Sequence, residues 1–227
     1  MKRLSLFASL LLSITVLFAS CNANNTVKGG AIGAGAGAAV GAGIGALLGN
    51  GKGAAIGAGI GTIVGGSAGA LIGNKMDKQA KEIEESIPEA TVETVNDGQA
   101  IKVTFDSGIF FASGKSTLND VSRTSLTNFA SSLKANPDTD VEIYGHTDSQ
   151  GGDKINVPLS QERADAVKSY LLGQGISSAR MTTAGMGSSQ QVVAEDSRGV
   201  AAKNRRVEIY ILPNSKMVKE AEAGTLK

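Results

Sequence analysis

Two oppositely charged side chains, Asp148 and Arg163, are the strongest candidates for binding chemistry in this chain. Asp148 lies in a polar loop that follows the alternating stretch Val141 to Tyr144, a pattern typical of a strand. A carboxylate can hold an ammonium group, and a guanidinium can hold a carboxylate through two parallel hydrogen bonds. The two residues therefore predict a small pocket for a zwitterion. Their spacing fits a plain surface ion pair between them equally well.

The helix that must position Arg163 is predicted to begin at Ser160. The Ser160 hydroxyl can accept hydrogen bonds from the free backbone N–H groups of a first turn, so it is a good N-cap. Apolar residues recur after it at helical spacing, namely Ala164, Val167, Tyr170 and Leu171. This places Arg163 in the first turn, where the helix dipole favours an acid over a cation. We therefore expect Arg163 to meet an anion.

Composition argues against several other kinds of site. The formal net charge is +1, from 22 basic and 21 acidic residues, and aromatic residues make up 4%. Without a polybasic run, nucleic acid is not an expected partner. One cysteine and one histidine make a poor zinc site, so we expect no metal and no cofactor. The single histidine, His146, has no nucleophile motif beside it, and we expect it to hydrogen-bond within its loop.

The first residues are typical of a secretory signal. Met1-Lys2-Arg3 is basic, and the apolar stretch from Leu4 to Phe18 is too short to span a membrane comfortably. The sequence LFASC, ending at Cys21, resembles a bacterial lipobox. That resemblance implies cleavage before Cys21, with a diacylglycerol on its sulfur and an acyl chain on its amino group, which together form a stable anchor. We predict a signal peptide over residues 1–20 and a lipidated tether over 21–28; an ordinary signal peptide is the alternative.

A glycine falls at every fourth position from Gly29 to Gly73. Ala31–Asn50 aligns without gaps on Ala55–Asn74, and each half would form an uncharged helix of ~30 Å. Glycine at this period lets two helix backbones approach closely, as in GxxxG packing inside lipid. The pattern resembles the glycine-zipper regions of envelope lipoproteins and predicts a helical hairpin over residues 29–74. The hairpin could insert in a membrane or pack on neighbouring copies, and a flexible linker is the alternative.

The remaining chain alternates strands and helices. Residues 75–97 are predicted to form a helical connector and the first strand. Counted from that strand, the predicted order is β-β-α-β-α-β-β, with Asn96-Asp97-Gly98 as a hairpin turn. Strands are predicted at 90–95, 100–105, 141–144, 181–184 and 207–212, and helices from Ser116 or Thr117 to about 134 and from Ser160 to 174. This pattern indicates an α+β domain, a mixed sheet covered by helices on one face, followed by a tail over 214–227.

These motifs resemble the OmpA-like domain over residues 98–213. The matching pieces include Gly145-His146-Thr147-Asp148-Ser149, Asn156, Leu159-Ser160, Arg163-Ala164 and Asn204-Arg205-Arg206-Val207. The resemblance implies non-covalent binding of peptidoglycan. It also implies that the loop aspartate and the helix arginine hold the free amino-acid end of diaminopimelate in the stem peptide, with Asp148 on the ammonium and Arg163 on the carboxylate.

The binding residues implied by the resemblance are Asp148, Arg163, Asn156, Thr147, Leu159, Ser160 and Arg205. Asn156 would organise the loop or donate to the ligand, and Thr147 would be a secondary contact. Leu159 and Ser160 would set the helix start. For Arg205, a structural pair with Asp148 or Glu208 is as consistent with the sequence as ligand contact.

Three function hypotheses follow. The first is an outer-membrane lipoprotein, not an enzyme, whose OmpA-like domain lies in the periplasm and tethers the envelope to peptidoglycan. The second is a membrane assembly or pore component, a homo-oligomer driven by the glycine segment. The third is a cell-wall hydrolase. A glycosidase needs a carboxyl group that gives up a proton, whereas a carboxylate beside an arginine stays charged, and this argues against the third hypothesis.

Overall fold

The computed structural model describes residues 64–227. The predictions for the signal peptide, for lipidation of Cys21 and for residues 29–63 of the glycine hairpin fall outside these residues. None of the helices within 64–227 combines the length and the apolar character that a membrane crossing needs.

The predicted order of strands and helices is confirmed. The elements are α5 (Gly66–Ser86), β1 (Thr91–Val95), β2 (Ala100–Asp106), α6 (Ser107–Phe110), α7 (Asp120–Ala135), β3 (Thr139–Gly145), α8 (Asp153–Gly173), η1 (Ser178–Arg180), β4 (Met181–Gly185), η2 (Ala202–Asn204), β5 (Arg206–Pro213) and α9 (Ser215–Glu222). The sheet order is β1-β2-β5-β3-β4. Strand β5 runs antiparallel to β2 and β3, whereas β3 and β4 are parallel, so the sheet is mixed, as expected for the predicted α+β class.

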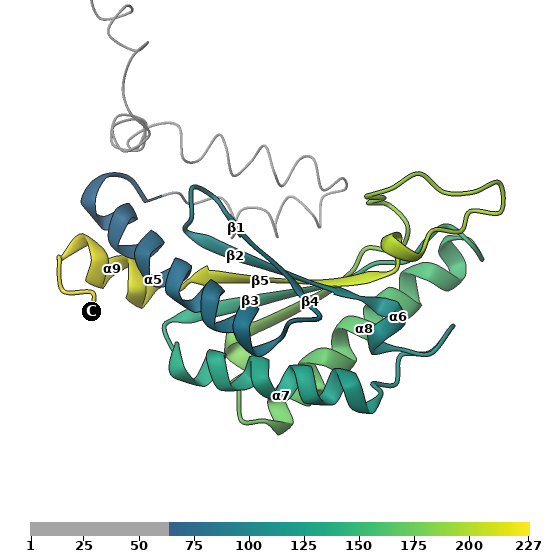
Figure 1. The fold of residues 1–227 in the computed structure, drawn as a ribbon, viewed down its shortest axis with the longest axis horizontal. Coiled ribbons are helices and arrows are strands. Elements are labelled where there is room, and N and C mark those ends of the chain that lie inside the picture. The colour runs from purple at the N-terminus through teal and green to yellow at the C-terminus, as the bar shows by residue number, and fades with distance from the viewer. Residues whose placement is uncertain (1–63) are drawn as a thin grey trace, which may run out of the picture.

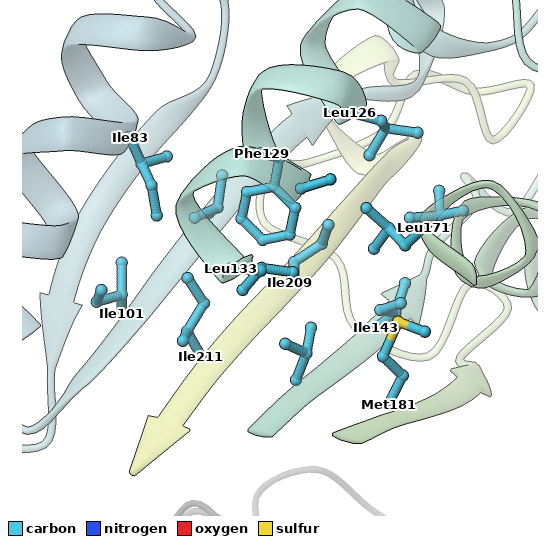
Figure 2. Packing of buried hydrophobic residues seen from close by; sticks show 14 of the residues in the cluster. Ile83, Ile101, Leu126, Phe129, Leu133, Ile143, Leu171, Met181, Ile209 and Ile211 are labelled. Carbon is cyan, nitrogen blue, oxygen red and sulfur yellow. The ribbon is translucent and has the colours of Figure 1, made fainter. Parts of the chain in front are cut away.

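Helices α5, α7 and α8 cover one face of the sheet (Figure 1). Alternate residues of the central strands face them and are fully buried: Ile101, Val103 and Phe105 on β2, and Val207, Ile209 and Ile211 on β5. Figure 2 shows Phe129 of α7 and Leu171 of α8 above this surface. The period-two spacing of these apolar residues is what allowed the strands to be predicted from the sequence.

Two predicted local features have different outcomes. The Asn96-Asp97-Gly98 turn is confirmed, because Asn96 and Asp97 adopt φ values of 54° and 53° and β1 pairs with β2 across it. Helix α7, by contrast, is capped by Asn119, whose side chain accepts from the Ser122 N–H at 2.9 Å. The prediction of a cap at Ser116 or Thr117 is therefore wrong, since the side chain that bonds the first turn comes later.

Helix α9 lies beside α5 at one end of the molecule (Figure 1). Met217 and Ala221 are buried in the same core as Ile72 and Met76 of α5. Asn214 caps α9 by accepting from two backbone N–H groups. This cap and the i, i+4 apolar pair are the sequence signals that could have predicted the helix. The core of the folded unit thus includes elements on both sides of residues 98–213.

The second half of the glycine repeat is not one helix over residues 55–74. Val64 and Gly65 are not helical, and Gly66, with a φ of 68°, begins α5. Such a backbone angle is open to glycine and strained for most other residues. The prediction of an uninterrupted second arm is wrong, because the last part of the repeat belongs to α5 and Ala68 is buried in the domain core.

Candidate functional site

Helix α8 begins well before the predicted start at Ser160. Gly151 and Gly152 adopt φ values of 93° and 74° and turn the chain into the helix, whose first residue is Asp153. An acid in the first turn suits the helix dipole. Ser160 is fully buried inside the helix, where its hydroxyl accepts from the Gly187 N–H at 2.9 Å. The N-cap prediction for Ser160 is therefore wrong.

Two glycines let α8 lie against the carboxyl ends of two strands. Gly145 of β3 and Gly185 of β4 are partners in the parallel ladder. A Cβ on Gly145 would lie 2.0 Å from the Ser160 oxygen, and one on Gly185 would lie 2.4 Å from the Gln161 nitrogen. The absence of side chains at these positions allows α8 to cross directly beside the loop that carries Asp148.

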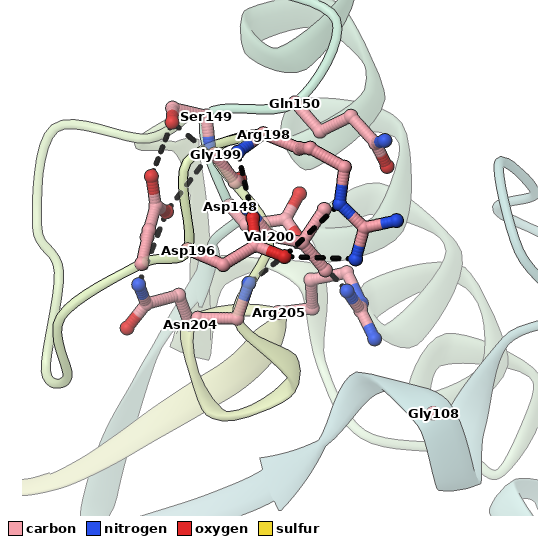
Figure 3. Close-up of polar contacts among 12 residues, drawn as sticks. Gly108, Asp148, Ser149, Gln150, Asp196, Arg198, Gly199, Val200, Asn204 and Arg205 are labelled. Atoms are coloured by element: carbon pink, nitrogen blue, oxygen red, sulfur yellow. Dashed lines mark hydrogen bonds and ion pairs between the residues drawn. The ribbon is translucent and has the colours of Figure 1, made fainter.

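Asp148 pairs with Arg205 rather than with Arg163 (Figure 3). Its Oδ2 lies 2.6 Å from Arg205 Nη1 and also accepts from the Ala201 N–H at 3.3 Å. Asp148 is 4% exposed, whereas the Arg205 side chain is 36% exposed. Of the alternatives that the sequence left open for Arg205, the structure shows the pair with Asp148. A surface ion pair between Asp148 and Arg163 is not formed, and that prediction is wrong.

Arg163 lies about three turns into α8, so its predicted place in the first turn is also wrong. It is 3% exposed, its Nε donates to the Lys115 carbonyl at 3.1 Å, and its guanidinium lies 5.2 Å from the centroid of the Phe111 ring. Burial, and then the nearby Arg205 charge, lower the pKa of Arg163. Its Nη1 is buried and has no hydrogen-bond partner. Because an unmet charged donor is costly, this nitrogen is poised for an anion.

Arg163 and Arg205 line two adjoining cavities of about 240 Å³ each. One cavity is also lined by Thr147, Asp148, Asn156 and Leu159, together with Gln150, Ile155, Ser113 and Gly114. The other is bounded by Ser107, Gly108, Phe111, Ala112, Ser113 and Gly114. The structure thus gathers the predicted site residues apart from Ser160. The wall formed by residues 107–114 was not among the predicted site residues.

Two predicted residues shape the loop around Asp148. The Asn156 side-chain amide donates to the carbonyls of Asp148 at 2.9 Å and Gln150 at 3.0 Å, so it organises the loop, as expected. The Thr147 N–H donates to the Gly187 carbonyl at 2.9 Å, while its buried hydroxyl has no partner. Both side chains therefore face the cavity from a fixed backbone.

His146 does not hydrogen-bond within the loop, and that expectation is wrong. Its ring is buried, neither ring nitrogen makes a hydrogen bond, and Nε2 lies 3.7 Å from a Glu208 carboxylate oxygen. Burial lowers the pKa of His146 to about 3. The His146 ring is therefore neutral and buried just after the end of β3. Within residues 64–227, no cluster of histidine, cysteine and acidic side chains has an arrangement that could hold a metal ion.

Comparison with known proteins defines the class. Residues 110–205 match the OmpA family, and residues 1–77 match the YMGG-like Gly-zipper family. The chain is 33% identical over 133 residues to the peptidoglycan-associated lipoprotein of Buchnera aphidicola, covering 59% of this chain and 72% of that protein. The chain belongs to the OmpA family.

Two further relatives extend this result. "Probable lipoprotein YiaD" of Escherichia coli is 36% identical over 138 residues, which cover 61% of this chain and 63% of that protein. The chain therefore matches less than two thirds of that relative's length. Among solved structures, a MotB like protein from Desulfovibrio vulgaris has a TM-score of 0.56 and 22% identity, over 65% of this chain and 96% of that one. This likeness shows the fold.

Proposed function

We propose that this protein is an outer-membrane lipoprotein that binds peptidoglycan non-covalently and so tethers the envelope to the cell wall. The observation that carries the proposal is the cavity in which Asp148, Arg163 and Arg205 meet, with one carboxylate and two guanidinium groups on its walls. Membership of the OmpA family supports this ligand class, as does the name of the Buchnera relative. The domain is a binding module rather than an enzyme.

The ligand we propose is the free amino-acid end of diaminopimelate in the stem peptide. The ligand ammonium binds Asp148, which is already held as an acceptor by the loop that Asn156 organises. The ligand carboxylate binds Arg163, whose Nη1 has no other partner. In the free protein Arg205 balances the Asp148 charge until the ammonium arrives. Both new contacts are charge-assisted hydrogen bonds, the strongest kind available to a protein surface.

The membrane attachment belongs to the same proposal. A lipid on Cys21 would hold the chain at the outer membrane, and the domain would lie in the periplasm, where the cell wall is. The LFASC sequence supports this arrangement, and the Buchnera and Escherichia coli relatives are named as lipoproteins. The glycine repeat would lie between the anchor and the domain, where it could contact the membrane or other copies.

The test is co-sedimentation of the full chain with purified sacculi. Asp148→Ala and Arg163→Ala should each weaken binding by about tenfold or more, because each removes a charge-assisted hydrogen bond of about 1.5–3 kcal/mol. Arg198→Ala is the matched control, since Arg198 is exposed and its ion pair is with Asp196 of its own loop. Free diaminopimelate should displace the native chain. Undiminished binding by both site variants, with native circular dichroism, would reject the proposed site.

A further inference from the structure

We propose that Glu195 is a positioning residue for this site, one that ties the loop carrying Asp148 to the segment carrying Arg205. The inference rests on the proposed function, because it concerns the same binding groups. Glu195 lies in the loop between β4 and β5, and it does not line either cavity. It would therefore act on the ligand through its neighbours.

The contacts of the Glu195 carboxylate join two segments that are far apart in sequence. Its Oε1 accepts from the Ser149 N–H at 3.0 Å and from Asn204 Nδ2 at 3.1 Å, and its Oε2 accepts from the Ser149 hydroxyl. Ser149 directly follows Asp148, and Asn204 directly precedes Arg205. Figure 3 shows Ser149 near Asp148 and Asn204 near Arg205. One carboxylate thus bridges the residues next to both partners of the ion pair.

The Asn204 side chain, at one end of this bridge, is held in place by several hydrogen bonds. It is fully buried, its side-chain oxygen accepts from the N–H groups of Val192 and Val193, and its nitrogen also donates to the Val193 carbonyl at 2.9 Å. On the other side, the Gln150 N–H donates to the Gly199 carbonyl at 3.0 Å. The hydrogen bond from Ser149 also lowers the pKa of Glu195, so the carboxylate is charged at neutral pH.

The bridge matters because binding changes the Asp148–Arg205 pair. In the free protein that pair itself holds the two segments together, with a separation of 2.6 Å. When a ligand ammonium engages Asp148, this direct contact weakens, and the Glu195 bridge is what keeps Asp148 and Arg205 at the spacing that the ligand needs. Removing Glu195 would leave the Ser149 N–H without its acceptor and the Ser149 hydroxyl with a long contact of 3.5 Å to the Gly199 carbonyl, next to the residue that receives the ammonium.

The test compares three variants of the full chain in sacculus binding. Glu195→Ala should weaken binding about tenfold, since it removes hydrogen bonds to a charged group. Glu195→Gln should rescue most of it, because an amide oxygen still accepts from Ser149 and Asn204. Asp196→Ala is the matched control, since the Asp196 carboxylate accepts from Arg198 and Val200 of its own loop, and this variant should bind like the native chain.

A double-mutant cycle separates positioning from general destabilisation. If Glu195 acts through Asp148, then Glu195→Ala should cost little further affinity in an Asp148→Asn background, and the two effects should be non-additive. Full additivity would overturn the proposal, as would an equal loss in Asp196→Ala. Thermal unfolding of each variant is measured alongside.

A readout without ligand keeps this inference distinct from the proposed function. Hydrogen exchange of the peptide around Ser149 should accelerate in Glu195→Ala and stay native in Asp196→Ala, because only the first loses the acceptor of the Ser149 N–H. Unchanged exchange in Glu195→Ala would overturn the bridge. If the native chain itself failed to bind sacculi, the proposed function would fall, and the exchange result would still decide whether Glu195 ties the two segments.

Discussion

Gly145→Ala should destabilise the domain strongly, because the added methyl group meets backbone on a buried face. Its Cβ would lie 2.0 Å from the Ser160 oxygen, 2.9 Å from the Ser160 carbonyl carbon and 3.2 Å from the Ser160 Cα. Strand β3 is held by ladders on both sides, and α8 is packed into the same core, so neither can move aside freely. Overpacking of this kind costs about 1–3 kcal/mol, and a clash with backbone belongs at the upper end, at about 3 kcal/mol.

The assay is urea unfolding followed by circular dichroism, together with sacculus binding below the unfolding transition. Gly173→Ala is the control, because Gly173 ends α8 and a Cβ there meets nothing within 4 Å. Alanine favours a helix by up to about 1 kcal/mol over glycine, so this variant should be as stable as the native chain or more so. The reasoning is refuted if Gly145→Ala loses less than about 1 kcal/mol. A variant that stays folded but binds weakly would show that the position of α8 sets the site.

Two other groups, the buried His146 and the half-buried Arg180, give predictions away from the ligand. Burial lowers the pKa of His146 from 6.5 to about 3. Between these pH values His146 is protonated in the unfolded chain and neutral in the folded protein. Stability should therefore fall by up to about 1.4 kcal/mol per pH unit as pH drops from 6.5 towards 3, and His146→Gln should flatten the slope of urea midpoints between pH 7 and 5; an unchanged slope contradicts this. The Arg180 guanidinium donates to the carbonyls of Leu133, Asn136 and Thr139, joining the end of α7 to β3. Arg180→Ala should lower the unfolding free energy by about 2 kcal/mol or more, with Arg180→Lys recovering only part; equal stability of all three forms would contradict it.

The fold could be predicted largely because apolar residues alternate with other residues along its strands, as at Ile101, Val103 and Phe105 of β2. The start of α8 could not be predicted from the same rules. Its first two turns carry Ile155 and Val157 exposed and Pro158 inside the helix, so no amphipathic pattern marks them. Asn156 lies in the same two turns but is buried, and its side chain donates to a carbonyl of the preceding loop. A tertiary contact, rather than a local cap at Ser160, thus accompanies the start of this helix.

The site was predictable in its residue types but not in its pairing. Asp148 and Arg163 do line one cavity, as their chemistry suggested. The partner of Asp148, however, is Arg205, which lies 57 residues away in the sequence. That pair exists because β5 lies next to β3 in the sheet, which brings the segment before β5 to the loop after β3. Spacing along the chain carries no information about such a neighbour until the sheet order is known.

The break at the start of α5 changes what the glycine repeat can do. The Gln99 side chain accepts from the Val64 N–H and donates to the Val64 carbonyl, both at 2.8 Å, so the chain is held where it enters the domain. A Cβ on Gly69 would lie 2.1 Å from that Val64 oxygen, so at this position the period-four glycine serves a contact inside the domain.

The same break limits any membrane crossing by the second half of the repeat. A helix that began at Ala55 and ended before Val64 would be about 14 Å long, which is less than half of the ~30 Å hydrocarbon core. The apolar residues after the break, such as Ile72, are already buried against the sheet and α9. The second half of the repeat therefore cannot cross a bilayer as one straight helix, because its downstream part belongs to helix α5 of the folded domain.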